Sequence, residues 1–366
     1  MKKYFLMLLL LSCCLCLCSC ADIVDKSSDN TSDLTIPFLI YENNNENNTL
    51  EAKLLYWNII EGKVVDKNEV AYKMTAADSA ESYIEPIIWG KGKFVVNDMD
   101  EIQPVKENVI KAENVSMTVW GENIKVVACF DETHNFTGHE ITVDENGVDR
   151  TVISDKFVVK NERGDNIGVF PSYVRYDNST GKLTFISIDF SSMMLDNIYV
   201  FEAKIDNISD IEMRKIPLSE NIETNGNAMP TLYNAVMNND TYYFQSFNSL
   251  AYCNVKTENS NTLDDISNRC RNVVKEGRFN PDFEKAIIPI GSYNDVIIVN
   301  VPISTDVDLE NIVCAISDNK IIGTMHLKKD GIWQIRNENA EVSDKFDVSN
   351  RDLYVKFYEY VTFPKY

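Results

Sequence analysis

Short apolar segments separated by turn residues run through most of this 366-residue chain, and they limit its fold more than any other feature. The region 172–216 shows the pattern best. It contains four alternating or apolar runs separated by Asp, Asn, Ser and Gly, at 172–176, 182–190, 197–203 and 211–216. Runs of this length that are rich in β-branched and aromatic residues and bounded by turn residues predict strands. We therefore expect a four-stranded antiparallel meander.

Similar hairpin patterns from residue 36 onward predict an all-β domain over 36–366. Four-stranded units at this spacing are typical of β-propeller blades, in which each sheet buries its faces against its neighbours. The domain is long enough for seven blades of about 47 residues or six of about 55. We predict a single β-propeller of six or seven four-stranded blades, with tandem β-sandwiches as the alternative fold.

Two further segments complete the expected fold. The C-terminal stretch 352–363 alternates strictly between apolar and other residues, and we expect it to pair with the first strand, 36–41, and close the ring. The stretch 262–275 has helical periodicity, with Thr262 and Asp265 resembling a capping box. This helix is an insertion between strands.

The N-terminus has the layout of an export signal. Lys2 and Lys3 precede a run of mostly apolar residues, 4–18, which is shorter than the ~20 residues that a membrane-spanning helix needs. The run ends in Leu17-Cys18-Ser19-Cys20, which resembles the lipobox of bacterial lipoproteins, although Ala, Ser or Thr is usual at the position of Cys18.

The lipoprotein resemblance implies where the chain is held. Residues 1–19 are then a signal peptide, and Cys20 becomes the mature N-terminus with a diacylglyceryl group, carrying fatty acids such as palmitate, on its sulfur. Residues 20–35, rich in Asp, Ser, Asn and Thr, are a flexible tether. We expect a protein anchored in the cell membrane by this lipid and facing the extracellular side, since two acyl chains give stable anchoring.

Charge excludes some partners. The chain has 56 acidic and 35 basic residues, and a net charge of -21. Nucleic-acid binding needs clustered Lys and Arg to neutralise phosphates, so we expect no nucleic-acid partner. Electrostatic docking on anionic lipid is disfavoured for the same reason. The acidity serves solubility, with cation binding or a basic partner as the alternative.

Five of the nine cysteines belong to the signal segment, which leaves Cys129, Cys253, Cys270 and Cys314. An exported chain sits where disulfides persist, and Cys253 with Cys270 is the candidate pair because the two are close in sequence. All four lie in apolar stretches, so the alternative is that they are free thiols of the core.

Aromatic residues beside turns or on one face of the last strand are the candidate binding residues: Trp57, Trp89, Trp120, Tyr243, Tyr358 and Tyr360. Exposed rings stack on sugars or peptides, whereas buried rings pack between sheets. For metals, the candidates are weaker. His134 and His139 match no zinc signature, and the Asp-rich turn 144–149 supplies oxygen ligands for calcium without the EF-hand pattern. We expect no cofactor, with Ca²⁺ as the alternative.

The sequence contains no phosphate-binding glycine loop, dinucleotide fingerprint or nucleophile elbow. We therefore expect a binding or interaction module that presents loops to a protein, peptide or glycan, and an enzyme is the less favoured class. One alternative is a surface glycan hydrolase or lyase whose carboxylates converge from separate strands. A second is a structural or sensory lipoprotein that partners a membrane complex.

The lipidation site gives a direct test. In Cys20→Ser the sulfur that would carry the diacylglyceryl group is missing, so we expect no incorporation of labelled palmitate and release of the protein from the membrane fraction. Cys129→Ser is the matched control and should be labelled like the wild type. Labelling that persists in Cys20→Ser would show that the lipobox assignment is wrong.

Overall fold

The computed structural model describes residues 34–44, 49–75, 87–89, 93–97, 102–113, 118–133, 135–160, 163–164, 166–188, 197–222, 235–246, 249–273, 287–304, 309–351 and 363–364. The expected signal peptide, nearly all of the tether and the segment 352–362 lie outside these residues. The domain begins with strand β1 at Thr35, one residue before the expected start.

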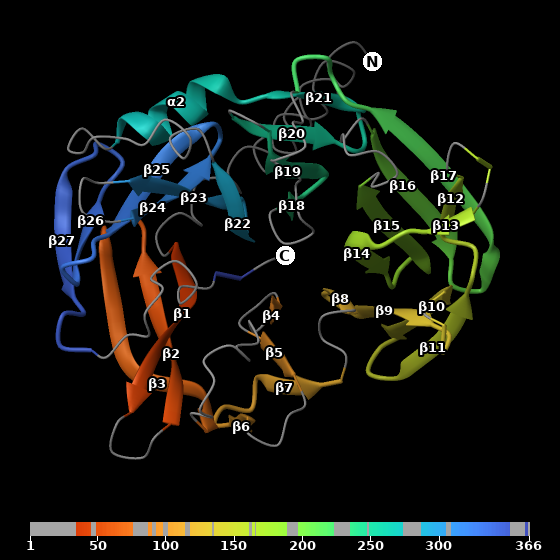
Figure 1. Ribbon diagram of the computed structural model, residues 1–366, viewed down its shortest axis with the longest axis horizontal. Coiled ribbons are helices and arrows are strands. Elements are labelled where there is room, and N and C mark those ends of the chain that lie inside the picture. Colours follow the sequence, from red (N-terminus) through yellow and green to blue (C-terminus); the bar gives the residue numbers. More distant parts are fainter. Residues whose placement is uncertain are drawn as a thin grey trace, which may run out of the picture.

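Five sheets of four or more strands stand as blades around a central axis, with the first strand of each sheet innermost (Figure 1). The first blade contains β1 (Thr35–Asn44), β2 (Thr49–Asn58), β3 (Lys63–Thr75) and β6 (Ile102–Pro104). The second contains β8 (Thr118–Gly121), β9 (Ile124–Phe130), β10 (Phe136–Asp144) and β11 (Asp149–Ser154). The third contains β14 (Pro171–Asp177), β15 (Lys182–Ile188), β16 (Asn197–Lys204) and β17 (Asn207–Pro217).

The last two blades are joined by the helix. The fourth blade contains β18 (Ala235–Asn238), β19 (Thr241–Gln245), β20 (Leu250–Asn254) and β21 (Asn259–Thr262), and α2 (Asp264–Asn272) follows it. The fifth contains β22 (Ile288–Tyr293), β23 (Val296–Ser304), β24 (Leu309–Ser317), β25 (Lys320–Leu327), β26 (Ile332–Arg336) and β27 (Val342–Asp347). The expected capping box is wrong, because Leu263 is the N-cap of α2 and makes no side-chain cap hydrogen bond.

Two smaller sheets complete the described residues. A three-stranded sheet lies between the first two blades (Figure 1) and contains β4 (Ile87–Trp89), β5 (Lys93–Asn97) and β7 (Val109–Ala112). A hairpin of β12 (Val158–Lys160) and β13 (Asn166–Gly168) lies next to the second blade. The pairing of β5 with β7 is parallel, whereas all other pairings between the described strands are antiparallel.

The all-β propeller predicted from the sequence is therefore the fold, and the meander predicted at 172–216 is the third blade. The number of blades differs from the expected six or seven, since the described residues form five blades of four or more strands. One reason lies between β25 and β26, where the turn 328–331 is long enough only for a hairpin. The chain therefore extends the fifth blade and does not begin another.

Central strands of a blade bury both of their faces, and each face packs toward a different neighbouring blade. In β16, Tyr199 and Phe201 pack toward the second blade, whereas Ile198 and Val200 pack toward the fourth. Successive side chains of a strand point to opposite faces. This two-sided burial explains why 198–201 reads as a continuous apolar run and not as an alternating one.

The ring is closed by packing of the first blade against the fifth. Phe38 of β1 and Trp57 of β2 share one fully buried cluster with Trp333 of β26. Phe363, near the C-terminus, stacks on Phe38 with 5.2 Å between ring centroids. The backbone N–H of Ser292 in β22 donates to the Pro364 carbonyl over 3.0 Å. The expected pairing of 352–363 with β1 falls almost wholly outside the described residues, but its last apolar residue does contact β1.

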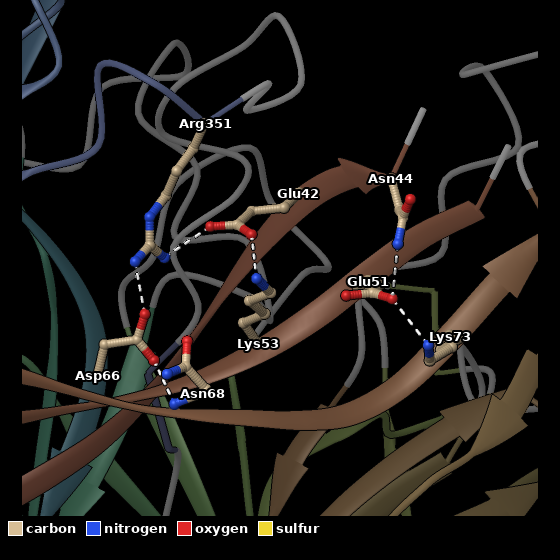
Figure 2. A network of polar contacts seen from close by, with 8 residues as sticks. All are labelled: Glu42, Asn44, Glu51, Lys53, Asp66, Asn68, Lys73 and Arg351. Carbon is tan, nitrogen blue, oxygen red and sulfur yellow. Dashed lines mark hydrogen bonds and ion pairs between the residues drawn. The ribbon is translucent and has the colours of Figure 1, made fainter. Parts of the chain in front are cut away.

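Polar contacts reinforce the same closure. Arg351, which follows β27, donates to Glu42 of β1 at 2.6 Å and to Asp66 of β3 at 2.5 Å (Figure 2). The Lys53 ammonium lies 2.5 Å from the other Glu42 oxygen. The Arg351 guanidinium therefore bridges two strands of the first blade. Because Arg351 follows the last strand of the fifth blade, these contacts connect the two blades.

A glycine permits one more closing contact. The Ser343 hydroxyl donates to the Gly62 carbonyl over 2.6 Å, between the fifth blade and the β2–β3 turn. Gly62 has a φ of +59°, and a Cβ there would lie 2.2 Å from the Ser343 oxygen. A side chain at this position is excluded both by the backbone conformation and by the approach of Ser343.

Replacing Arg351 tests the polar closure. Arg351→Met keeps much of the side-chain volume but leaves Glu42 and Asp66 without their shared cation. We expect the free energy of unfolding to fall by about 2 kcal/mol, below the full cost for a deeply buried pair because these side chains keep some exposure. Urea unfolding measures the change.

Lys63→Met is the matched control, because it removes an ion pair with Glu61 whose two side chains are about half exposed. Its free energy of unfolding should stay close to that of the wild type. Equal effects of the two substitutions would contradict a special role of Arg351 in closure.

Candidate functional site

A cavity of about 2040 Å³ opens at one end of the ring, and we call it the axial cavity. Hairpin turns from all five blades line it. They include the turns that join the two innermost strands of the second to fifth blades, at 121–123, 177–178, 238–239 and 294–295. In the second to fifth blades the first strand faces the axis, and the turn that follows it is placed at the rim of the central opening (Figure 1).

Turn geometry selects the residues of this rim. Asn239, Asn294 and Asn319 have φ values of +51°, +51° and +57°. Asparagine tolerates this left-handed conformation better than other residues with a Cβ. Tight hairpins therefore place carboxamides around the cavity as a result of backbone requirements, and those groups are available to hydrogen-bond a ligand.

The lining of the axial cavity is acidic on balance. It contains five carboxylates, from Glu122, Asp177, Asp295, Asp318 and Glu338, and three cationic side chains, from Lys93, Arg175 and Lys320. The Asn239 amide donates to the Asp295 carboxylate over 3.2 Å and so links the rims of the fourth and fifth blades.

Asp177 is held by its own turn. Its carboxylate accepts hydrogen bonds from the Ser179 hydroxyl and backbone N–H and from the Thr180 hydroxyl, at 2.6, 2.9 and 2.8 Å. These bonds, led by that from the Ser179 side chain, lower the pKa of Asp177 to about 2. Asp177 is therefore ionised at neutral pH and contributes a fixed negative charge to the rim.

Four aromatic residues complete the lining, and one of them, Tyr176, is buried. Trp120, Tyr173 and Tyr243 are partly buried and reach the axial cavity from β8, β14 and β19. Burial raises the pKa of both Tyr173 and Tyr243, so their hydroxyls stay neutral and able to donate. The Lys125 ammonium lies 5.8 Å from the Trp120 ring centre. Trp120 also borders a second cavity, of about 1240 Å³, beside the second blade.

The structure separates the aromatic residues that were candidates from the sequence. Trp120 and Tyr243 line the axial cavity, so they stay candidate binding residues. Trp57 is a correction: it is fully buried between the first and fifth blades, so it packs and cannot stack on a ligand. Trp89 is the last residue of β4, and its side chain is outside the described part, as are Tyr358 and Tyr360.

Sequence reasoning missed several lining residues, among them Tyr173, Arg175 and Asp295. A signal was present. Arg175 and Asp295 lie close to or in the turn that follows the first strand of a blade, Tyr173 lies within such a strand, and those turns share one end of the propeller. The positions at which the blades begin in the sequence would have identified these residues. Those positions could not be determined before the sheet boundaries were known.

His139 is a core residue. Its ring is fully buried, and its Nε2 lies 2.8 Å from the Val169 carbonyl oxygen, to which it donates. The rings of Phe136, Phe157 and Phe185 surround it at centroid distances of 4.8, 5.8 and 6.0 Å. Burial lowers the pKa of His139 to about 4. The other metal candidate, His134, lies outside the described residues.

Other metal arrangements find no support in the described part of the chain. No group of three or more His, Cys, Asp or Glu side chains suited to a metal ion occurs there. In the Asp-rich turn 144–149, Asp144 accepts a hydrogen bond from the Gly147 N–H over 2.5 Å, which stabilises the turn itself. Among the same described residues, we find no helix with the length and apolar character required to cross a bilayer.

The four cysteines outside the signal segment are free thiols. The candidate pair, Cys253 with Cys270, is a correction. Cys253 belongs to the core between the third and fourth blades, whereas Cys270 belongs to the core between the fourth and fifth. Their proximity in sequence does not bring them together, because β20 and α2 direct the two side chains into different cores.

Comparison with known proteins gives no family. No protein-family model matches the sequence, and no curated protein matches it. Among solved structures, the CNH domain of AfRom2 aligns over 85% of this chain and 85% of its own, with 7% identity and a TM-score of 0.28. TolB from Acinetobacter baumannii aligns over 83% of this chain, with 6% identity and a TM-score of 0.29. The alignment covers 62% of the TolB chain. The assignment of the fold therefore rests on the sheet topology.

The neutral, buried His139 predicts a pH dependence of stability. Its pKa is about 4 in the folded chain against 6.5 for the ordinary group, so the unfolded chain binds more protons between these values. Stability therefore falls as the pH drops from about 7.5 to about 5, by about 2 kcal/mol from this group. Urea unfolding at both pH values measures the loss.

His139→Gln is the comparison, because an amide N–H replaces the ring donor to Val169 and does not titrate. The variant should be less stable at neutral pH, and its stability should depend less on pH by the same ~2 kcal/mol. If wild type and variant lose equal stability on acidification, His139 is not the source.

Proposed function

We propose that this chain is a binding module that takes a basic peptide, or a basic segment of a partner protein, into the axial cavity. The excess of carboxylates over cations in the lining carries the proposal. A chain with a net charge of -21 attracts basic partners at long range, and the rim concentrates that attraction at one opening.

The remaining lining groups suit a peptide. Trp120 and Tyr243 offer flat apolar faces against which aliphatic stems and peptide planes pack. The cation of a Lys or Arg side chain is attracted to the same faces. Rim carboxamides such as Asn294 and Asn319 both donate and accept, and so match the polar groups of a peptide backbone.

Attachment to a membrane belongs to the same proposal and is supported by the sequence alone. A diacylglyceryl group on Cys20 would hold the module on the extracellular side of the cell membrane, and 20–35 would serve as the tether. A module held there would bind partners that reach the cell surface. A structural or sensory role in a membrane complex is one case of such binding.

A glycan hydrolase or lyase is the second candidate, and one observation favours it: five carboxylates and Arg175 share one cavity. Glycoside hydrolysis requires one acid that is protonated at the working pH. Asp177 does not meet that requirement, because its pKa is about 2. The other carboxylates of the rim remain candidates for this chemistry.

The test compares rim and outer surface. A peptide array first selects a Lys- and Arg-rich peptide that binds the wild type. Asp295→Asn combined with Asp318→Asn should then weaken binding of that peptide by about tenfold, since two carboxylates of the rim lose their charge. Binding should also weaken as salt is added, because ions screen the attraction. Isothermal calorimetry measures both effects.

Asp210→Asn combined with Glu212→Gln is the matched control, because it also removes two negative charges, here on the exposed outer strand β17. It should leave the affinity unchanged. Equal weakening by the control would mean that net charge and not the rim binds the peptide. Cleavage of chromogenic glycosides that is lost in the rim variant would support the enzyme instead.

A further inference from the structure

Helix α2 spans the junction between the fourth and fifth blades. It contacts β20 of the fourth blade and β25 of the fifth (Figure 1). Ile266 and Cys270 form its buried face and join the core between those blades. The helix is therefore a short strap that is held to both blades by apolar contacts.

Cys314 reaches the same core from the opposite side. It lies in β24, and it shares the buried face of that strand with Ile312 and Ile316. Cys270 and Cys314 are both fully buried. A side-chain interaction with Cys270, followed by burial, holds the pKa of Cys314 well above its usual range. Two cysteines 44 positions apart in the sequence thus share one core between helix and strand.

We propose that Cys270 and Cys314 form a disulfide site, oxidised by exchange with a small disulfide such as oxidised glutathione. The geometry supplies two fully buried thiols on different elements of one core, and a disulfide between them would join those elements. The function proposed above plays no part in this inference, and neither does the location of the chain.

The reaction balances as an exchange. The thiolate of one cysteine attacks oxidised glutathione, forms a mixed disulfide and releases one glutathione thiolate. The thiolate of the other cysteine then attacks the cysteine sulfur of the mixed disulfide, forms the Cys270–Cys314 bond and releases the second glutathione. The two cysteines are oxidised by two electrons, the glutathione disulfide is reduced, and the two cysteine protons end on the glutathione thiols.

Burial determines when the exchange takes place. A fully buried thiol does not meet glutathione while α2 is packed, so oxidation requires the strap to be undocked, either during folding or by local opening. α2 has nine residues and four of them are charged, so it is held mainly by its few buried side chains. Once formed, the disulfide fixes the strap to the central strand β24 of the fifth blade.

Refolding with a defined oxidant tests the site. The full-length chain is refolded from urea with oxidised and reduced glutathione, alkylated, digested without reductant and mapped by mass spectrometry. We expect a peptide pair linked through Cys270 and Cys314 that is 2 Da lighter than the two free-thiol peptides together. The oxidised protein should melt several degrees above the same protein treated with a reductant.

Matched variants decide the assignment. Cys253→Ser should keep the linked pair, because Cys253 lies in a different core, and Cys314→Ser should lose both the pair and the dependence of Tm on reductant. Alkylation of both Cys270 and Cys314 after refolding with oxidised glutathione would overturn the proposal, and so would a Cys253–Cys270 link. If Cys314→Ser does not fold, the peptide map of the wild type still decides.

Discussion

Closure of the ring depends on the contact between the first and fifth blades. The other blades follow one another along the chain, but these two are brought together from its opposite ends. Apolar burial of Trp57 and Trp333 stabilises this contact. Arg351 adds specificity, because its planar guanidinium donates to both Glu42 and Asp66 only when the two carboxylates are correctly placed. If this contact opened, the turns at the end of the ring would no longer surround one space.

The axial cavity follows from that closure and from turn chemistry. A hairpin whose backbone enters the left-handed region favours Asn or Asp, and the fourth and fifth blades present such turns at the end of the ring where the second and third blades also present polar turns. Each turn alone is an ordinary loop on a hairpin. Only the ring makes their carboxylates and carboxamides face one another, so the ligand site is a property of the assembly of blades and not of any one of them.

The parts of this fold that can be predicted from sequence are those that local rules determine. The meander of β14–β17 was predictable because strand alternation and turn residues specify it without reference to the rest of the chain. The number of blades was not, because whether β26 extends a sheet or begins a new one depends on what packs beside it. Trp57 and Trp120 both lie beside turns, yet one is core and the other lines the cavity. Likewise, Cys270 shares a core with Cys314 and not with Cys253, although Cys253 is nearer to it in sequence.

The two-sided burial of the central strands has a consequence for how this sequence can vary. Val200 and Phe201 are adjacent in the chain, but they belong to separate cores and share few partners. Substitutions at these two positions should therefore be nearly additive in their effects on stability, whereas Val200 and Met237, which lie in one core, should be coupled. In a collection of variants, substitutions that compensate each other in stability would therefore occur at pairs of positions far apart along the chain and not at adjacent positions.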